Sequence, residues 1–341
     1  MAQVNRTLSD ELEHEDENST SHMGGFYAAV DVPPIVVAIL IIALNSLVLI
    51  LVVRVKQLRT TTNFLLCSLA VSDLLTGLVS IPLFTSCNIL QTLTICIVAE
   101  NVLRFTSIST VLHLLAITTD RYMAIMHSLR YYNIVTRHRG YWVIACTWII
   151  STSTAFIQLA WNNPSALENT HDEPPESLIQ HELRYDFFNL AVFFCIPLLA
   201  MVYVNSRIFY EVVRQTKLMR RNFPGWQSAR ETTGREWKAA LTFAVMFAVF
   251  IACWCPYFLL RLQQNLGNEL MFEVSRVGGY VIAFLRFLTS LLNPCIYVLG
   301  KTDFRKAIRG KAARRKAVSS FSKTSGGKYN GMSSATKSTS M

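Results

Sequence analysis

Seven stretches of this sequence are each apolar over roughly 20 residues or more, the length that a helix needs to cross the hydrocarbon core of a bilayer. The third stretch is the least apolar, because it carries Glu100, Arg104 and His113, and the connections are short except at 162–186 and 213–237. Hydrophobic residues make up 52% of the chain and charged residues 16%, whereas about 25% are charged in an average soluble domain. We therefore predict an all-α membrane protein with seven transmembrane helices, at residues 33–54, 62–86, 96–120, 140–161, 187–212, 238–262 and 274–299.

The charged residues are sorted along the chain. Lys and Arg gather after the first, third and fifth apolar stretches and from Lys301 onward, whereas Asp and Glu gather in residues 1–31 and 162–186. Because cytosolic loops carry the excess of Lys and Arg, this pattern predicts an extracellular N-terminus and a cytosolic C-terminus in a multi-pass protein of the plasma membrane. The formal net charge of +10 thus reflects membrane topology, and we expect no nucleic-acid partner.

The two end segments have different predicted properties. Residues 1–31 contain no signal peptide, so we expect the first helix itself to direct the chain to the membrane. Sequons at Asn5 and Asn18 lie on the side that the charges place outside the cell, which predicts an extracellular, glycosylated segment. Residues 314–341 are rich in Ser, Thr, Gly and Lys and predict a disordered cytosolic tail.

Several polar residues and prolines interrupt the apolar stretches. An ionisable group in hydrocarbon costs several kcal/mol, so Asp73 in the second stretch requires a partner, water or a function. Asn293-Pro294 in the seventh stretch and Cys253-Trp254-Cys255-Pro256 in the sixth place helix-breaking prolines beside groups that can bridge neighbouring helices. Asp120-Arg121-Tyr122 closes the third stretch at the predicted cytosolic edge.

In this order, these residues resemble the motifs of the rhodopsin-like, or class A, family of G-protein-coupled receptors over roughly residues 30–310. The resemblance implies a membrane domain over residues 32–300 and an amphipathic eighth helix over 301–313, whose Phe304 and Ile308 we expect to face lipid. It implies a receptor that catalyses no reaction, activates a heterotrimeric G protein and is regulated by receptor kinases and arrestin. The matching residues are Asn45, Asp73, Cys96, Asp120-Arg121-Tyr122, Trp148, Pro197, Cys253-Trp254-Cys255-Pro256 and Asn293-Pro294-Cys295-Ile296-Tyr297.

The resemblance also assigns an activation switch. Arg121 would pair with Asp120, and could reach Glu236, in the resting state; opening of the sixth helix at a hinge would then break that lock. Leu129 matches the loop position that packs against the G protein, although Ser128 stands where the family usually has proline. The remaining members of the predicted switch are Tyr122, Trp254, Pro256, Asn293, Pro294 and Tyr297.

A sodium pocket is implied by the same resemblance. The matching residues are Asp73, Thr110, Ser290 and Asn293, close to Trp254. We expect Na⁺ to bind Asp73 and to favour the resting state, and we expect no other metal and no cofactor.

The branch of the family is less sharply indicated. Residues 128–136 look most like the melanocortin and adenosine receptor branch. No cysteine occurs in 162–186, which points the same way and leaves Cys96 without its normal partner; Cys87 is the other candidate within plausible reach. Amine receptors carry an aspartate where this chain has Leu103, and opsins carry a lysine where it has Phe287. A monoamine ligand is thereby disfavoured and a visual pigment is excluded.

Three charged residues in the outer half of the bundle suggest ligand contacts. Glu100 and Arg104 lie four residues apart and can pair on one helix face, and Arg286 lies two turns outward from Asn293. One interpretation is a structural network in which Glu100 neutralises an arginine; the other is that Arg104 or Arg286 binds a carboxylate or phosphate of the ligand. A third alternative is a basic peptide attracted by the acidic outer segments. The candidate ligand residues are Glu100, Leu103, Arg104, Ser107, Trp254, Tyr257 and Arg286.

Two other function classes predict features that differ from those of this sequence. A seven-helix transporter or channel would predict internal repeats and a polar path through the membrane, and the sequence shows no repeat. An enzyme would require a metal-ligand, nucleophile or phosphate-loop motif, and none is present in the sequence. The leading prediction is a receptor for an extracellular peptide, nucleoside or anionic small molecule or lipid.

Overall fold

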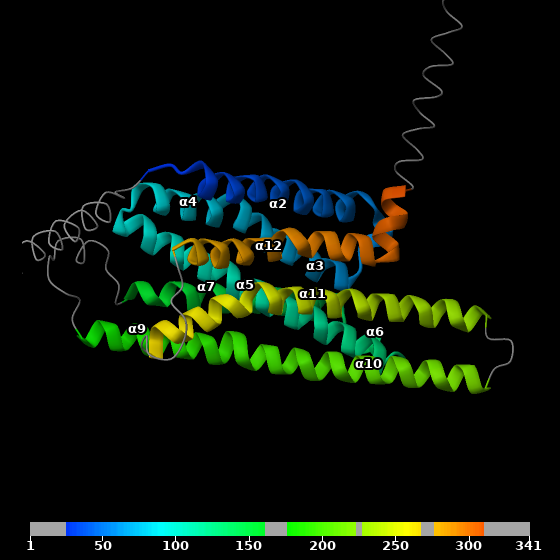
Figure 1. Ribbon diagram of the computed structural model, residues 1–341. Coiled ribbons are helices and arrows are strands. Elements are labelled where there is room, and N and C mark those ends of the chain that lie inside the picture. Colours follow the sequence, from blue (N-terminus) through cyan, green and yellow to red (C-terminus); the bar gives the residue numbers. More distant parts are fainter. Residues whose placement is uncertain (1–24, 161–175, 223–226, 267–275, 310–341) are drawn as a thin grey trace, which may run out of the picture.

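The computed structural model describes residues 25–160, 176–222, 227–266 and 276–309, and within these ranges the chain is helical, without strands. Seven helical segments lie side by side in one bundle (Figure 1). The all-α, seven-helix fold is therefore confirmed. In chain order the segments are α2 (Ala28–Arg54), α3 to α4 (Thr61–Leu75 and Ile81–Leu90), α5 (Leu93–Met126), α7 (Arg137–Phe156), α9 to α10 (Glu176–Asn189 and Ile196–Asn222), α11 (Gln227–Leu266) and α12 (Arg276–Gly300).

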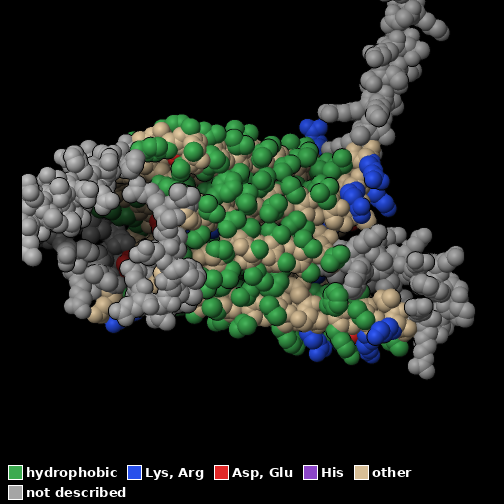
Figure 2. Space-filling view, viewed as in Figure 1, with side chains coloured by type: hydrophobic (Ala, Val, Ile, Leu, Met, Phe, Trp, Pro, Cys, Tyr) green, Lys and Arg blue, Asp and Glu red, His purple; other side chains and the backbone are tan. Residues whose placement is uncertain are grey.

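The bundle has a polar interior and an apolar exterior, which is the distribution that a lipid solvent selects. Asn45, Asp73 and Asn293 are fully buried, whereas Ile39 and Leu199 are 61% and 68% exposed. Figure 2 shows hydrophobic side chains covering the middle of the bundle, with Lys and Arg gathered at the end that carries residues 301–309. Six helices are long and apolar enough to cross a membrane, and α11 adds the shorter apolar segment Ala244–Leu260 within the described part of the chain. The chain is thus a multi-pass membrane protein.

Short irregular turns of helix link the segments. The single-turn helices η1 (Lys56–Leu58) and α6 (Tyr131–Ile134) connect α2 to α3 and α5 to α7, and η3 (Ile157–Ala160) extends α7. Two π-helical turns, η2 (Thr76–Ser80) and η4 (Leu190–Cys195), lie inside the second and fifth spans.

Each π-helical turn comes just before a proline at the second residue of the next helix, Pro82 in α4 and Pro197 in α10. Proline lacks the N–H that an α-helix would use and its ring displaces the preceding turn, so the helix widens there without breaking. Pro256 and Pro294 lie inside α11 and α12.

Contacts between α2 and its neighbours fix the first span. Gly77 in η2 approaches α2 so closely that an added Cβ atom would lie 3.1 Å from the Ala38 carbonyl oxygen and from two isoleucine side chains. Asn45 in turn donates hydrogen bonds to the carbonyl oxygens of Ile41, at 3.0 Å, and Ser290, at 3.2 Å. The hydrogen bond to Ser290 links α2 to α12.

The fifth and sixth helices are longer than the apolar stretches predict. The connection expected over 213–237 is largely helical, because α10 runs to Asn222 and α11 begins at Gln227, and α9 begins at Glu176 inside the expected outer loop. Hydropathy detects the membrane-crossing part of a helix, whereas Glu, Arg, Lys and Gln continue a helix readily in water. Glu211 and Arg214, paired at 3.2 Å, support such a turn.

The short helix over 302–309 differs from expectation in its packing. Phe304 is fully buried in the main core cluster and lies 5.8 Å, between ring centroids, from Tyr297, and Ile308 packs against the same cluster. The expectation that Phe304 faces lipid is therefore wrong. The four-residue spacing of Phe304 and Ile308 marks an apolar face correctly, but that face meets the bundle and not the bilayer. Residues 310–313 of the predicted helix lie outside the described residues.

Candidate ligand cavity and activation sites

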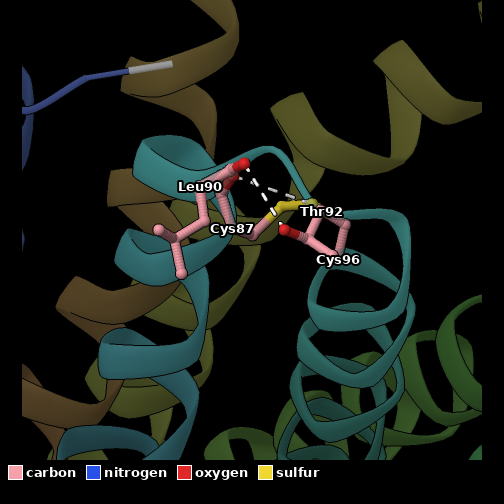
Figure 3. Close-up of a disulfide and its surroundings, with 4 residues drawn as sticks. All are labelled: Cys87, Leu90, Thr92 and Cys96. Atoms are coloured by element: carbon pink, nitrogen blue, oxygen red, sulfur yellow. Dashed lines mark hydrogen bonds between the residues drawn. A yellow bond between two sulfur atoms is a disulfide. The ribbon is translucent and has the colours of Figure 1, made fainter.

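We call the end of the bundle where α4 meets α5 the outer end, and the end that carries residues 301–309 the inner end. A disulfide joins Cys87, near the end of α4, to Cys96, in the first turn of α5, with their Cα atoms 4.9 Å apart (Figure 3). The chain reverses at Gln91, whose φ of 49° is the left-handed conformation. Cys96 is therefore bonded to Cys87, the other cysteine that the sequence placed within plausible reach.

A cavity of about 580 Å³, counting its open mouth, lies in the outer half of the bundle between α5, α9, α11 and α12. Its apolar wall comes from Ile108, Val111, Leu190, Phe193 and Phe258. Its polar wall comes from Arg104, Ser107, Asp186, Asn189 and Arg286, with Trp254 and Tyr257 completing the lining. An apolar cavity with a few convergent polar groups has the form of a small-ligand site.

Arg104 is held by groups of the protein itself. Its guanidinium lies 3.5 Å from a carboxylate oxygen of Glu100 and 3.5 Å from one of Asp186. It also donates a hydrogen bond to Gln158 and lies over the ring of Tyr185, 5.0 Å from its centroid. Two carboxylates and an amide therefore surround this cation.

Arg286, on the opposite side of the cavity, has a different environment. It is 8% exposed, and its Nη2 donates to Ser107 Oγ at 3.3 Å. Its Cζ lies 3.9 Å from the ring centroid of Tyr257 and 5.1 Å from that of Trp254. The buried Nε has no hydrogen-bond acceptor, and none of the carboxylates in the described ranges lies within ion-pair distance of this side chain.

The predicted ligand residues do not all line this cavity. Glu100 lies outside the lining and pairs with Arg104. Leu103 packs in an apolar cluster with Phe287 and lines a deeper, narrow cavity. The residues that do line the outer cavity are Arg104, Ser107, Trp254, Tyr257 and Arg286.

Two partners of Arg104 on other helical segments, Asp186 and Gln158, are not among the residues predicted from the sequence. Asp186 lies 11 residues before Pro197 on the same helical segment. That spacing is about three helical turns and places it in the outer half of the span. Counting turns from the motif proline could therefore have identified this carboxylate, whereas its pairing with Arg104 depends on the rotation of two helices.

The middle of the bundle holds the predicted sodium residues. Asn293 donates to Asp73 at 3.3 Å, and both side chains are fully buried. Asp73 Oδ1 and Asn293 Oδ1 have no hydrogen-bond partner, and the hydroxyls of Thr110 and Ser290 line the deeper cavity. Oxygen atoms of this kind suit a hard cation, so these residues fit a sodium ion.

A charge cluster closes the inner end of α5. Arg121 pairs with Asp120 at 2.6 Å and donates to the hydroxyl of Thr62, which itself donates to Asp120 at 2.7 Å. The Tyr131 hydroxyl, on the connection after α5, donates to the other carboxylate oxygen of Asp120 at 2.8 Å. Burial and the neighbouring Asp120 raise the pKa of Tyr131, so its phenol stays a neutral donor. The cluster fixes Arg121 against α3 and the connecting helix.

Lys301 anchors the start of the last helix beside this cluster. Its Nζ donates to the Asn63 side chain at 2.5 Å. Burial, together with the nearby Arg121, lowers the pKa of Lys301 to about 7. Arg121 and Lys301 both line an open inner cavity of about 1880 Å³, whose rim includes Arg59 and Arg137.

The other predicted switch residues occupy distinct positions. Trp254, 4% exposed, stacks on Phe250 and donates to Thr289 at 3.1 Å, two residues before Pro256 in α11. Tyr297 is fully buried next to Pro294 and Asn293, Tyr122 packs on Ile208 and Val212, and Leu129 is 97% exposed. The side chain of Glu236 and both sequons, at Asn5 and Asn18, lie outside the described residues.

An outer cavity and an inner charge cluster on a seven-helix membrane bundle define the architecture of a membrane receptor. A family model described as 7 transmembrane receptor (rhodopsin family) matches residues 44–297. The chain belongs to this family, which is a class of G-protein-coupled receptors without enzymatic activity.

Several receptors are similar to most of the chain. The human histamine H2 receptor is 31% identical over 310 residues, which cover 85% of this chain and 82% of that protein. The QRFP-like peptide receptor of Branchiostoma floridae is 28% identical over 275 residues, covering 77% and 71%. The octopamine receptor beta-1R of Drosophila melanogaster is 26% identical over 327 residues, covering 86% and 63%. These relatives do not single out the melanocortin and adenosine branch that residues 128–136 favoured.

Proposed function

We propose that this chain is a plasma-membrane receptor with its outer end outside the cell, which binds an extracellular ligand in the outer cavity and activates a heterotrimeric G protein at its inner end. The observation that carries the proposal is the arrangement along one helix. α5 contributes Arg104 and Ser107 to the cavity and, four to five turns further on, Asp120 and Arg121 to the inner cluster. A rigid helix that joins a ligand cavity to a charge cluster can couple the two sites.

Nucleotide exchange on purified G proteins tests this proposal. Membranes that contain the full chain should accelerate exchange above membranes without it. Arg121→Ala should return the rate to the background, because it removes the cation held by Asp120 and Thr62 at the inner cavity. Arg214→Ala, at an exposed arginine outside that cavity, is the matched control and should keep the rate of the wild type. Equal rates with and without the wild-type chain, across the common classes of G protein, would reject G-protein activation.

The ligand class is constrained from two sides. The similar proteins are named as amine and peptide receptors. The amine receptors among them count in favour of a monoamine ligand, against the expectation from the sequence. Against an amine stands Leu103, an apolar residue at the position of the amine-binding aspartate. In the described lining of the outer cavity the acidic residue is Asp186, which is already paired with Arg104. We therefore retain a peptide or an anionic small molecule ahead of a monoamine.

Sodium is proposed to stabilise the resting receptor at Asp73. If Na⁺ is present at about ten times its Kd, it should stabilise the folded receptor by about 1.4 kcal/mol. We expect a melting temperature a few degrees higher in NaCl than in KCl of the same ionic strength, and no difference in Asp73→Asn, which removes the charged ligand beside Asn293. Asp303→Asn, at an exposed carboxylate, is the control and should respond to sodium as the wild type does. A sodium shift that survives Asp73→Asn would refute this site.

Arrestin and receptor kinases are proposed partners of the cytosolic tail. The support is the run of Ser319, Ser320, Ser322, Thr324 and Ser325 after the basic Arg314-Arg315-Lys316. These residues lie outside the described part of the chain.

A further inference from the structure

We propose, on the basis of the receptor function above, that the outer cavity selects a ligand with one carboxylate group on an apolar or aromatic body, and that Arg286 binds this carboxylate. The inference deepens the proposed function, because it names the chemical class of the ligand.

The environment of Arg286 is incomplete in the protein alone. Its guanidinium is buried, its Nε has no acceptor, and no acidic side chain among the described residues lies within ion-pair distance of it. A buried charge is strongly disfavoured unless it is paired and hydrogen-bonded. Since the side chain lines the cavity, a ligand anion can supply both the missing acceptor and the missing negative charge.

Neighbouring side chains hold this guanidinium in place without using up its donors. The rings of Tyr257 and Trp254 lie 3.9 and 5.1 Å from its Cζ, where their faces attract a cation. Ser107 accepts one hydrogen bond, at 3.3 Å. A guanidinium carries five N–H donors, so a carboxylate can still be bound by a pair of them.

The second arginine of the cavity limits the ligand to a single negative charge. Arg104 is already opposed by Glu100 and Asp186, each at 3.5 Å, and it donates to Gln158. The two negative charges of a phosphate would therefore face one unpaired cation, Arg286, and would be repelled by the carboxylate of Asp186. A monocarboxylate matches the one cation that remains unpaired in the described lining of this cavity.

The rest of the lining determines what the carboxylate is attached to. Leu190 and Phe193 of η4 and Phe258 of α11 form an apolar wall. A ligand with an aromatic or aliphatic body can pack there while its carboxylate reaches Arg286. Arg286 also contacts the ring of Trp254 and lines the deeper cavity beneath it. Neutralisation of Arg286 by the ligand would therefore act directly on Trp254, two residues before Pro256 in α11.

Three matched pairs of probes test the charge preference with the ring kept constant. The carboxylates are indole-3-propionate, 3-phenylpropionate and imidazole-4-propionate, and the corresponding amines are tryptamine, 2-phenylethylamine and histamine. Binding at up to millimolar concentration is measured as the shift in melting temperature of the purified full-length receptor, and G-protein nucleotide exchange is measured in parallel. We expect saturable binding in the carboxylate series and a weaker response, or none, to the amines.

Substitutions of two arginines, Arg286 and Arg214, test whether carboxylate binding depends on Arg286. Arg286→Gln should weaken carboxylate binding about 10- to 100-fold, as expected for the loss of hydrogen bonds to a charged group. Arg214→Gln, at an exposed arginine of the inner half of α10, should leave carboxylate binding unchanged. If Arg286→Gln does not fold, Arg286→Lys replaces it; this variant should keep the preference for carboxylates with a lower affinity, because it retains the charge and loses the paired donors.

Tighter binding of the amines than of the carboxylates would overturn the proposal. So would equal carboxylate binding by the wild type and the Arg286 variants. A failure of every carboxylate probe to bind in a way that depends on Arg286 would also overturn it. None of these affects the receptor function itself, which is decided by basal nucleotide exchange and the Arg121→Ala variant. Loss of that exchange with Arg286-dependent carboxylate binding intact would instead leave a carboxylate-binding protein that does not activate G proteins.

Discussion

Replacing Asp120 with asparagine should raise basal nucleotide exchange by the unliganded receptor about 5- to 30-fold, the effect of shifting the equilibrium by about 1–2 kcal/mol. In the structure this carboxylate accepts hydrogen bonds from Arg121, Thr62 and Tyr131, at 2.6, 2.7 and 2.8 Å. An asparagine has no charge to oppose Arg121 and only one acceptor oxygen, so at least one of these donors loses its partner. Arg121 is then released toward the open inner cavity where a G protein would dock.

The experiment compares exchange rates at equal receptor density. Glu211→Gln is the matched control, because this carboxylate on the inner half of α10 pairs with Arg214 and does not line the inner cavity. Tyr131→Phe should produce a smaller increase, since it removes one of the three donors and leaves the ion pair. Unchanged or lower basal exchange in Asp120→Asn would show that this cluster does not restrain the receptor.

Contacts between residues close to one another in the chain can be predicted from the sequence. The seven spans follow from hydropathy, and the pairing of Glu100 with Arg104 follows from the four-residue spacing on α5. Cys87 and Cys96 were named together because loop 162–186 offers no other cysteine. In each case the relevant distance along the chain is short and the local geometry is regular.

Contacts between helices that are distant in the chain cannot be predicted in this way, because they depend on how each helix is rotated about its axis. Arg104 meets Asp186 only because α5 and α9 turn these side chains toward one cavity. Leu103, one residue before Arg104 and therefore about 100° away around the helix, faces the cluster with Phe287 instead. The same limitation explains why Arg104 and Arg286 looked equivalent as anion sites, although the structure gives acidic partners to the first.

The last helix presents a similar case, in which an apolar face was recognised but its partner was not. Phe304→Ala should destabilise the receptor by about 3–5 kcal/mol, the usual cost of truncating a fully buried phenylalanine. Phe304 is 0% exposed and packs on Tyr297, which is itself fully buried and lies three residues after Pro294 in α12. The substitution should therefore loosen both the helix over 302–309 and the inner half of α12.

Thermal unfolding of the purified receptor measures this effect, with surface expression as a second readout. Phe304→Leu should cost much less, because it keeps most of the buried volume. Lys306→Ala, at an exposed position on the same helix, should leave the melting temperature unchanged. If Phe304 instead faced lipid, truncation would weaken membrane contact of the short helix and leave the melting temperature of the bundle nearly unchanged. A large drop for alanine with a small drop for leucine would thus identify this side chain as the residue that packs the last helix against α12.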